Sequence, residues 1–293
     1  MSEPIDLNEA FGRRTVAERI KESFNKFAID NASGDGFRDH LGASVIGHEC
    51  DRYLWNHFRW MRREIHSARM YSLFDQGHRI EKQMRETLEN LGAKFYYPNP
   101  DNHEEQLKFS DIDGHFGGSC DGVFTWPEIG LPDWYILECK SSKTGSTFDQ
   151  LTKIEVAGAQ PRHYAQQSVY GLKFQIRHAL YIAYNKNDSS IYFEIVDLDW
   201  MLGEEMTKRA DYVIHSQEPP AKVKGASPNF FICKMCTTYW GICHMGDKPV
   251  PNCRNCVHSR PVENGEWKCL HWDSIIPTDT IPKGCAEHVG LST

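Results

Sequence analysis

Apolar residues recur at helical spacing in three parts of the first third of the chain. Between residues 8 and 31 they alternate with charges, which predicts an amphipathic helix that ends at the glycine-rich run NASGDG. A short helix is expected to begin near Cys50, and a third to run from about Tyr71 to Leu91, before Gly92. The expected apolar stripes are Phe11, Val16, Ile20, Phe24, Phe27 and Ile29 on the first helix and Phe74, Ile80, Met84, Leu88 and Leu91 on the third.

Strand-like runs follow this helical part. They cover residues 94–97, 106–110, 114–126 and 134–141, and after a helix over 161–174 two more cover 178–184 and 191–196. A last helix over 200–215 leads into SQEPPAKVKGASPN, whose Pro, Gly and Ser content indicates a linker or exposed loop. The pattern predicts an α/β fold in which helices flank a mixed central β-sheet.

Charged residues gather at the ends of two of these strands, between Asp111 and Lys140. Within WYILECKS, Glu138 and Lys140 share one face of the strand because side chains alternate. Asp121 follows the pair Gly117 and Gly118, where a bend would aim its carboxylate toward the same point. Two carboxylates and an ammonium there suggest a magnesium-type site, and a solvated strand end is the alternative.

Composition narrows the class of protein. The chain has 293 residues, 40% of them hydrophobic and 25% charged, with no run long enough for a membrane span and no signal-peptide core at its start. We therefore expect a soluble cytoplasmic protein. The net charge of −7 argues against indiscriminate coating of nucleic acid but leaves room for a local basic groove. Candidates for DNA contact are Arg52, Arg59, Arg62 and Arg63, with Arg69 nearby, and a solvated helix face is the alternative reading.

The order of polar residues along the chain is more specific than any one of them. His78 on an early helix is followed by Asp121, by Glu138-x-Lys140, and by Gln166 with Tyr170 four residues later. This order resembles the RecB-type branch of the PD-(D/E)xK nuclease superfamily, over residues 45–200 and the cysteines on either side. The resemblance implies a restriction-endonuclease-like core. Gln167 offers a competing register for the glutamine, but it lacks the tyrosine four residues on.

The resemblance also implies roles. Asp121 and Glu138 would ligate Mg²⁺ or Mn²⁺ together with the backbone carbonyl of Cys139, and His78 would add a further ligand. Lys140 would orient the attacking water and stabilise the developing charge.

The resemblance also assigns the glutamine and the tyrosine of the later helix. Gln166 and Tyr170 would position the water and the DNA backbone. Asp113 and His115 are candidates for supporting the metal ligands or, equally, for a turn. We expect the thiols of Cys120 and Cys139 to face the core without a chemical role, and a satisfied core histidine is the alternative for His78.

Seven of the ten cysteines lie after residue 230. Cys233, Cys236 and Cys243 form a close set that lacks a fourth partner nearby. RecB-type nucleases with an iron-sulfur cluster are similar in using one earlier cysteine, here Cys50. By this resemblance the four would hold a [4Fe-4S] cluster as a structural staple, with Zn²⁺ as the alternative and redox sensing also open.

The last four cysteines form a second set. Cys253, Cys256, Cys269 and Cys285 follow a Cys-x-x-Cys start typical of a compact zinc site, with His258, His271 and His288 as alternative ligands. A segment of this length needs a metal to fold alone. We therefore divide the chain into a helical region (1–44), a nuclease core closed by a cysteine cluster (45–247) and a zinc-binding module (248–293), which would serve DNA contact, partner docking or stability.

These features together predict a metal-dependent DNA nuclease. The resemblance favours an exonuclease acting on single-stranded or duplex DNA ends in recombination, repair or phage DNA processing, with a recombinase or helicase as a further partner and no membrane association. The alternatives are a structure-specific endonuclease and a nucleic-acid-binding adaptor with an inactive nuclease fold. The intact Asp121, Glu138 and Lys140 argue against the adaptor.

Overall fold

The computed structural model describes residues 13–31, 38–63, 66–143 and 145–292. Its contacts divide the chain into two compact units, one formed by residues 1–36 and 64–79 and the other by 37–63 and 80–293. Helix α5 (Ala68–Asn90) contributes its first half to the first unit and its second half to the other. Over the described residues, no helix has both the length and the apolar character that a membrane span needs.

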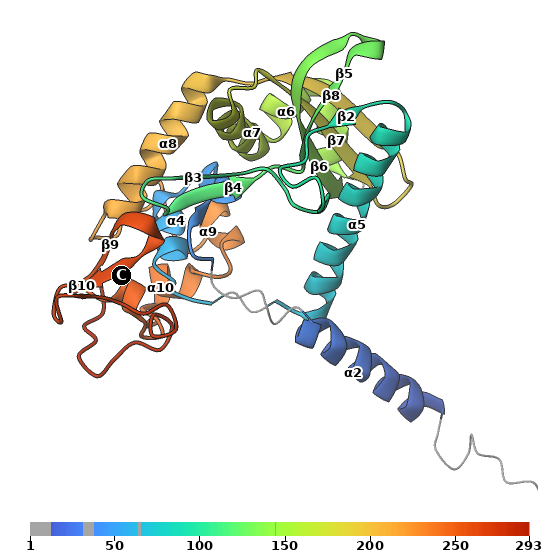
Figure 1. Cartoon of the computed structure of the whole chain (residues 1–293). Coiled ribbons are helices and arrows are strands. Elements are labelled where there is room, and N and C mark those ends of the chain that lie inside the picture. Colours follow the sequence, from blue (N-terminus) through green and yellow to red (C-terminus); the bar gives the residue numbers. More distant parts are fainter. Residues whose placement is uncertain (1–12, 32–37, 64–65, 144, 293) are drawn as a thin grey trace, which may run out of the picture. The chain divides into compact units, whose positions relative to one another are not determined.

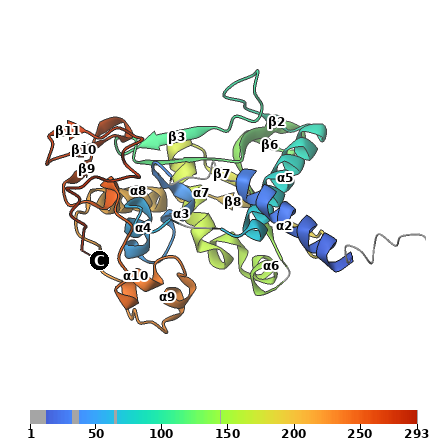
Figure 2. The ribbon, with the colours of Figure 1, turned by 90° about the horizontal axis from the view of Figure 1, so that it is seen from below.

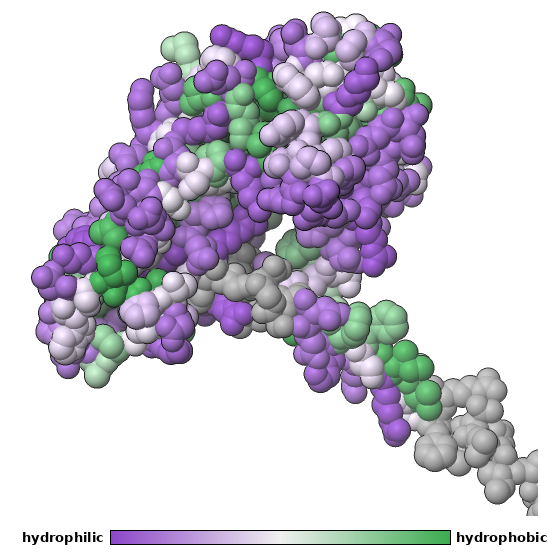
Figure 3. All heavy atoms as spheres, in the orientation of Figure 1, coloured by the Kyte–Doolittle hydropathy of each residue, from purple (hydrophilic) through white to green (hydrophobic). Residues whose placement is uncertain are grey.

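The first unit contains helix α2 (Arg13–Asn31), which confirms the predicted helix over its described part. The apolar positions of α2 are exposed, and Phe24 reaches 73%. Figure 3 accordingly shows hydrophobic residues, in green, on the surface of this helix. Phe11 of the predicted stripe lies outside the described residues.

The second unit is built on a five-stranded sheet in the order β2-β5-β6-β7-β8 (Figure 1). Its strands are β2 (Lys94–Phe95), β5 (Gly122–Trp126), β6 (Leu131–Ser142), β7 (His178–Asn185) and β8 (Ile191–Asp197). The β6–β7 pair is parallel and the other three pairs are antiparallel. The predicted mixed sheet with flanking helices is therefore confirmed.

Helices cover both faces of this sheet. On one face Ile80, Met84 and Leu88 of α5 pack against β5, β6 and β7, and this contact fixes the second half of α5. On the other face lie α6 (Ser146–Ala159) and α7 (Pro161–Phe174), which form the crossover between the parallel strands β6 and β7. Helix α8 (Trp200–His215) packs on α7 (Figure 2).

A short contact joins α7 to the segment before Cys50. Helices α3 (Ala43–Ile46) and α4 (Asp51–Phe58) flank this segment. A Cβ atom on Gly47 would stand 2.8 Å from the Arg162 Cα and 3.1 Å from the Ala165 Cβ, so only glycine fits there without displacement. The loop that carries Cys50 is thus seated directly on the first turns of α7.

A second, three-stranded sheet has the order β1-β4-β3, with β1 (Leu41–Gly42), β3 (Lys108–Asp111) and β4 (Phe116–Ser119). The single strand predicted over 114–126 is wrong, because β4 and β5 belong to different sheets and the chain leaves one sheet for the other at Cys120 and Asp121. This break places Asp121 where two sheets meet.

The predicted burial of two residues in the α5 stripe is also wrong. Phe74 is 38% exposed and Leu91 62% exposed, so only the middle of the predicted α5 stripe is buried. Helix α6 was not predicted, and it is interrupted by a kink at Ile154 and Glu155, where Glu155 has a positive φ of 56°.

The C-terminal part belongs to the second unit. It contains α9 (Phe231–Met235), α10 (Trp240–Met245), and a small antiparallel sheet of β9 (Ser259–Pro261), β10 (Trp267–Cys269) and β11 (Ser274–Ile275). Trp267 is fully buried with its ring 5.3 Å from that of Phe58, and the Gly265 N–H donates to the Asp113 carbonyl at 2.6 Å. These contacts fasten residues 253–276 to α4 and to the β3–β4 turn.

Candidate active site

The predicted acids meet where β5 and β6 begin to pair. Gly122 lies opposite Leu137 in the antiparallel register, so Asp121 falls beside Glu138. The Cys139 N–H donates to Asp121 Oδ2 at 2.7 Å, which fixes the Asp121 carboxylate against β6. The strand break at Cys120 and Asp121 therefore places the acid that precedes β5 beside an acid of β6.

Glu138 is the most enclosed group of the site. Its side chain is fully buried, the Lys140 ammonium contacts Oε1, and Oε2 has no hydrogen-bond partner among the described residues. Burial and the nearby Asp121 raise the pKa of Glu138 to about 7, although Lys140 opposes the shift. A buried carboxylate oxygen without a donor is costly unless a cation or a proton compensates it.

Glu81 is a third acid of the site, and the sequence pattern alone does not indicate it. It lies on α5, three residues after His78, and Gln106 Nε2 donates to its Oε1 at 2.9 Å. Burial and the charge of Asp121 raise the pKa of Glu81 to about 7. The signal in the sequence was only its spacing from His78, and its proximity to Asp121 depends on α5 packing across the sheet.

Lys140 is the cation of this cluster. Burial alone would lower the pKa of its ammonium, but Glu138 and Asp121 raise it above the usual value, so Lys140 stays charged. One ammonium thus faces three carboxylates, and the excess negative charge suits an added cation.

The glutamine and the tyrosine of α7 also face this region. Gln166 Nε2 donates to the Tyr170 hydroxyl at 3.3 Å, and both side chains are buried. Gln167 donates instead to the His163 carbonyl at 3.2 Å, so Gln166 is the residue in register with Tyr170. Burial and the charge of Glu138 raise the pKa of Tyr170, which keeps its hydroxyl protonated.

Several other sequence candidates lie elsewhere or remain predictions. His78 belongs to the first compact unit, and its role as a metal ligand stays a prediction. Asp113 lies in the β3–β4 turn with a φ of 55°, and His115 Nε2 contacts the Val262 carbonyl at 2.8 Å. Both therefore serve the turn and its attachment to the C-terminal part.

The arginine cluster needs a correction. Arg59 is fully buried, and its guanidinium donates to the carbonyls of Arg254, Ile214 and Ser216, so it is not available to DNA. Arg52 donates to the Pro219 and Pro220 carbonyls and Arg62 pairs with Asp247 at 3.4 Å. Arg63 is exposed, and DNA contact by Arg52, Arg62 and Arg63 stays a prediction.

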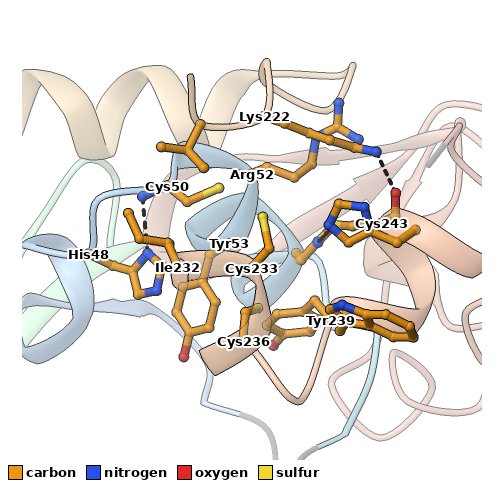
Figure 4. Close-up of a pocket in the computed structure, with 14 residues that line it drawn as sticks. His48, Cys50, Arg52, Tyr53, Lys222, Ile232, Cys233, Cys236, Tyr239 and Cys243 are labelled. Atoms are coloured by element: carbon orange, nitrogen blue, oxygen red, sulfur yellow. Dashed lines mark hydrogen bonds between the residues drawn. The ribbon is translucent and has the colours of Figure 1, made fainter. Parts of the chain in front are cut away.

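A separate pocket brings together the first cysteine set (Figure 4). Its lining includes Cys50, Cys233, Cys236 and Cys243, from the start of α4 and from α9 and α10. Burial and the other three sulfurs raise the pKa of Cys236 to about 11. Thiols that raise one another's pKa values are a donor set that a metal would stabilise as thiolates.

Polar groups around this pocket favour thiolates. Asn56 Nδ2 donates to the Cys243 sulfur at 3.7 Å, and the charges of Arg52 and Lys222 oppose the rise that burial causes in the Cys243 pKa. The donor set therefore fits an iron-sulfur cluster or Zn²⁺.

The second cysteine set is also clustered. Burial, followed by the charges of Cys285, Cys256 and Cys269, raises the pKa of Cys253 to about 11. His288 Nε2 contacts Asn255 Oδ1 at 2.8 Å, and the rings of His258 and His271 lie 5.3 Å apart.

These donor groups are near one another without being in coordination geometry. Within residues 13–31, 38–63, 66–143 and 145–292, no three His, Cys, Asp or Glu side chains are arranged to hold a metal ion as they stand. The oxygen donors around Glu138 fit Mg²⁺ or Mn²⁺, and the sulfur donors of both cysteine sets fit softer metals. Binding would require local convergence of the side chains.

Comparisons with known proteins give structural matches only. The chain is similar to SSO0001 (14% identity, TM-score 0.44, covering 76% of this chain and 96% of that chain). It is also similar to LHK-Exo in complex with dAMP, with 15% identity and a TM-score of 0.40. The alkaline exonuclease LHK-Exo from Laribacter hongkongensis is similar at 14% identity and a TM-score of 0.40. Each of these two matches covers 66% of this chain and 90% of the other chain. No protein-family model matches, and no curated protein matches significantly. The interpretation of the site rests on its own side chains.

Proposed function

We propose that this protein is a divalent-metal-dependent DNA nuclease. One observation carries the proposal: the fully buried Glu138 has a carboxylate oxygen without a hydrogen-bond partner among the described residues, beside Asp121 and Lys140. A purely structural cluster would be more stable with fewer carboxylates, since like charges in a buried site repel. A site that binds a divalent cation and a phosphodiester needs several carboxylates, because they ligate the cation.

The side chains would divide the chemistry of phosphodiester hydrolysis. Asp121, Glu138, Glu81 and the Cys139 carbonyl would hold Mg²⁺ or Mn²⁺, with His78 as a further ligand. When bound, this ion supplies a more acidic water and neutralises charge on the phosphate. Lys140, kept charged by its acidic neighbours, would donate to the attacking water or to a non-bridging phosphate oxygen.

The helix α7 would complete the site. Gln166 and the protonated Tyr170 form a hydrogen-bonded pair, and both can donate to water or to a phosphate oxygen. We propose cleavage from DNA ends because the order of residues resembles RecB-type exonucleases. Recombination, repair or phage DNA processing are the roles that this activity would serve, with a recombinase or helicase as partner.

The two cysteine sets would be structural. We propose a [4Fe-4S] cluster at Cys50, Cys233, Cys236 and Cys243, with Zn²⁺ as the alternative, and Zn²⁺ at Cys253, Cys256, Cys269 and Cys285. The first set would join the start of α4 to a segment far along the chain, and the second would join the two ends of the C-terminal segment, so that metal binding adds directly to folding stability.

The test uses end-labelled linear DNA and covalently closed circular DNA with Mn²⁺. We expect degradation of the linear substrate and at least about a hundredfold loss in Glu138→Gln, which keeps the side-chain shape but removes the charge. Glu128→Gln is the matched control, since Glu128 is exposed and pairs with Lys94 at 3.1 Å. Equal activity of Glu138→Gln and the wild-type protein, or no cleavage at all, refutes the enzyme and favours the adaptor. Cleavage of closed circles favours an endonuclease.

A further inference from the structure

One arginine holds both ends of the loop that carries Cys50. Arg209 of α8 donates from Nη1 to the Ile46 carbonyl at 2.7 Å and from Nε to Asp51 Oδ1 at 2.6 Å. Ile46 is the last residue of α3 and Asp51 the first of α4, so a single guanidinium spans residues 47–50. The Arg209 side chain is 18% exposed, which shields both contacts from water. Arginine suits this position because its rigid, planar fork can donate to two acceptors at once.

The loop between these two ends is held against α7. Gly47 is seated on the Arg162 backbone, and Glu49 forms an ion pair with the Arg162 side chain. His48 is 8% exposed, and its Nδ1 accepts the Cys50 N–H at 3.1 Å (Figure 4). The backbone on both sides of Cys50 therefore has fixed partners.

Ring contacts join the loop to the other wall of the cysteine pocket. The rings of His48 and Tyr53 stack with their centroids 3.9 Å apart and an interplanar angle of 10°. Tyr53 in turn meets Tyr239 edge to face at 5.3 Å, and Tyr239 lies in the segment with the other three cysteines. Arg209 is not one of the described residues that line the pocket. An effect of Arg209 on the cysteines must therefore pass through the loop.

Cys50 is far from its partners along the chain. The other three cysteines of the first set lie within residues 233–243, so a four-thiolate site forms only if the loop brings Cys50 to them. A ligand that is held in place before metal binds loses little conformational freedom on binding, whereas a mobile ligand loses much more. The fixed loop is thus a preformed part of the metal site.

We propose that Arg209 is a positioning residue for metal at the first cysteine set. By joining Ile46 to Asp51, it holds Cys50 at the pocket in the metal-free protein, so that a metal ion or an iron-sulfur cluster meets this ligand already in place. The inference rests on the proposed metal site of that set and is independent of whether the protein cleaves DNA. The order of the loop can be measured without any metal.

The first readout is hydrogen exchange of the metal-free protein, resolved by peptide mass spectrometry. We expect the amides of residues 46–54 to exchange about tenfold faster in Arg209→Gln, because both ends of the loop lose a hydrogen bond. Lys208→Gln is the matched control and should exchange like wild type, since Lys208 is an exposed residue of the same helix that pairs with Glu204 at 3.8 Å. Unchanged exchange of residues 46–54 in Arg209→Gln overturns the proposal.

Asp51→Ala tests the same contact from its other side. The variant removes one of the two acceptors of Arg209, so exchange of the loop should rise less than in Arg209→Gln. The double variant should exchange no faster than Arg209→Gln, because Asp51 acts on the loop through the arginine. Additive effects of the two substitutions overturn the proposal. Asp51→Ala also keeps the role of the contact measurable if Arg209→Gln fails to fold.

The second readout is the Zn²⁺ concentration that protects each cysteine from iodoacetamide. Metal-free, reduced protein is equilibrated with buffered Zn²⁺, alkylated briefly and analysed peptide by peptide. We expect the first cysteine set of Arg209→Gln to need about tenfold more free Zn²⁺ for half-protection, because Cys50 must then be ordered on binding. Protection of Cys253 and Cys256 in the second set should not change, and Lys208→Gln should match wild type at both sets.

Each alternative gives a distinct result. Equal Zn²⁺ protection of the first set in Arg209→Gln and wild type overturns the proposal. An equal loss of protection at both sets also overturns it, since that result indicates general destabilisation. If Zn²⁺ does not protect the first set of the wild-type protein, the metal site is refuted and the role of Arg209 with it. Absence of DNA cleavage refutes the proposed nuclease and leaves the role of Arg209 standing.

Discussion

The backbone amide of Cys139 donates to Asp121 Oδ2 at 2.7 Å. This bond ties the residue before β5 to β6, and the charge of Asp121 contributes to the raised pKa values of Glu81 and Glu138. The amide therefore holds Asp121 against β6 despite the repulsion from the neighbouring acids.

The raised carboxyl pKa values predict how stability depends on pH. Glu138 and Glu81 move from about 4.5 to about 7, so the folded protein binds more protons than the unfolded chain between these values. Without divalent cations, these two carboxyls contribute a loss of stability as the pH rises from about 4.5 to 7. Buried histidines oppose this contribution, since burial lowers the pKa of His48 to about 4 and that of His163 to about 3. The carboxyl contribution is therefore read as a difference between wild type and a variant. Urea unfolding at a series of pH values, in buffers without Mg²⁺ or Mn²⁺, measures this slope.

Glu138→Gln supplies the comparison for this slope. Because glutamine does not titrate, the variant should gain stability relative to wild type as the pH rises through this window in the absence of metal. Glu128→Gln should keep the wild-type slope, since the pKa of this exposed carboxyl is lowered by its own backbone and by Lys94. Identical slopes for wild type and Glu138→Gln would contradict the assignment.

Glu81 should contribute to metal binding. We expect Glu81→Gln to cleave about 10- to 100-fold more slowly at low Mn²⁺ and to recover partly at high Mn²⁺, because a lost carboxylate weakens the site for the cation. The measurement is a Mn²⁺ titration of the cleavage rate. Glu86→Gln, at an exposed position of the same helix, should follow the wild-type curve, and a wild-type curve for Glu81→Gln would remove Glu81 from the site.

The cysteine pocket should contain iron and sulfide. Protein purified without oxygen should be brown, with about four iron and four sulfide ions per chain. Cys243→Ala should lose the colour and most of the iron. Cys120→Ala should keep both, because Cys120 is buried in the core beside the Leu107 carbonyl. A colourless wild-type protein with two zinc ions would establish the alternative metal.

The C-terminal part should stabilise the β3–β4 turn through its metal. We expect Cys285→Ser to lose one zinc ion and to speed hydrogen exchange of residues 108–119, since the Gly265 N–H holds the Asp113 carbonyl. His288→Ala tests the competing ligand and should keep its zinc, because His288 is engaged by Asn255. Zinc loss in His288→Ala but not in Cys285→Ser would show that His288, and not Cys285, is the fourth zinc ligand.

Local sequence signals were sufficient for some elements. The helix over Pro161–Phe174 was predicted with its observed bounds because proline is favoured at a helix start. The helix Trp200–His215 follows Asp199, whose side chain accepts from the Met201 and Leu202 amides. Such caps act within a few residues, so they can be read from the chain.

Other features depend on contacts between distant segments. Arg59 looked like a surface cation, yet carbonyls about 155 to 195 residues later surround it. Glu81 gained significance only when α5 packed across the sheet, and the placement of Asp121 beside Glu138 required the antiparallel register of β5 and β6. A single sequence contains no signal for these neighbours, because each arises from tertiary packing.

The fit of Gly47 on α7 bears on the order in which the protein matures. The loop before Cys50 and the helix with Gln166 and Tyr170 are synthesised well before Cys233. A nascent chain therefore contains every proposed catalytic residue before its cysteine pocket can close. If metal at that pocket steadies the loop on α7, the proposed nuclease would remain poorly active until the cell supplies the metal, and that supply would limit when DNA is exposed to the activity.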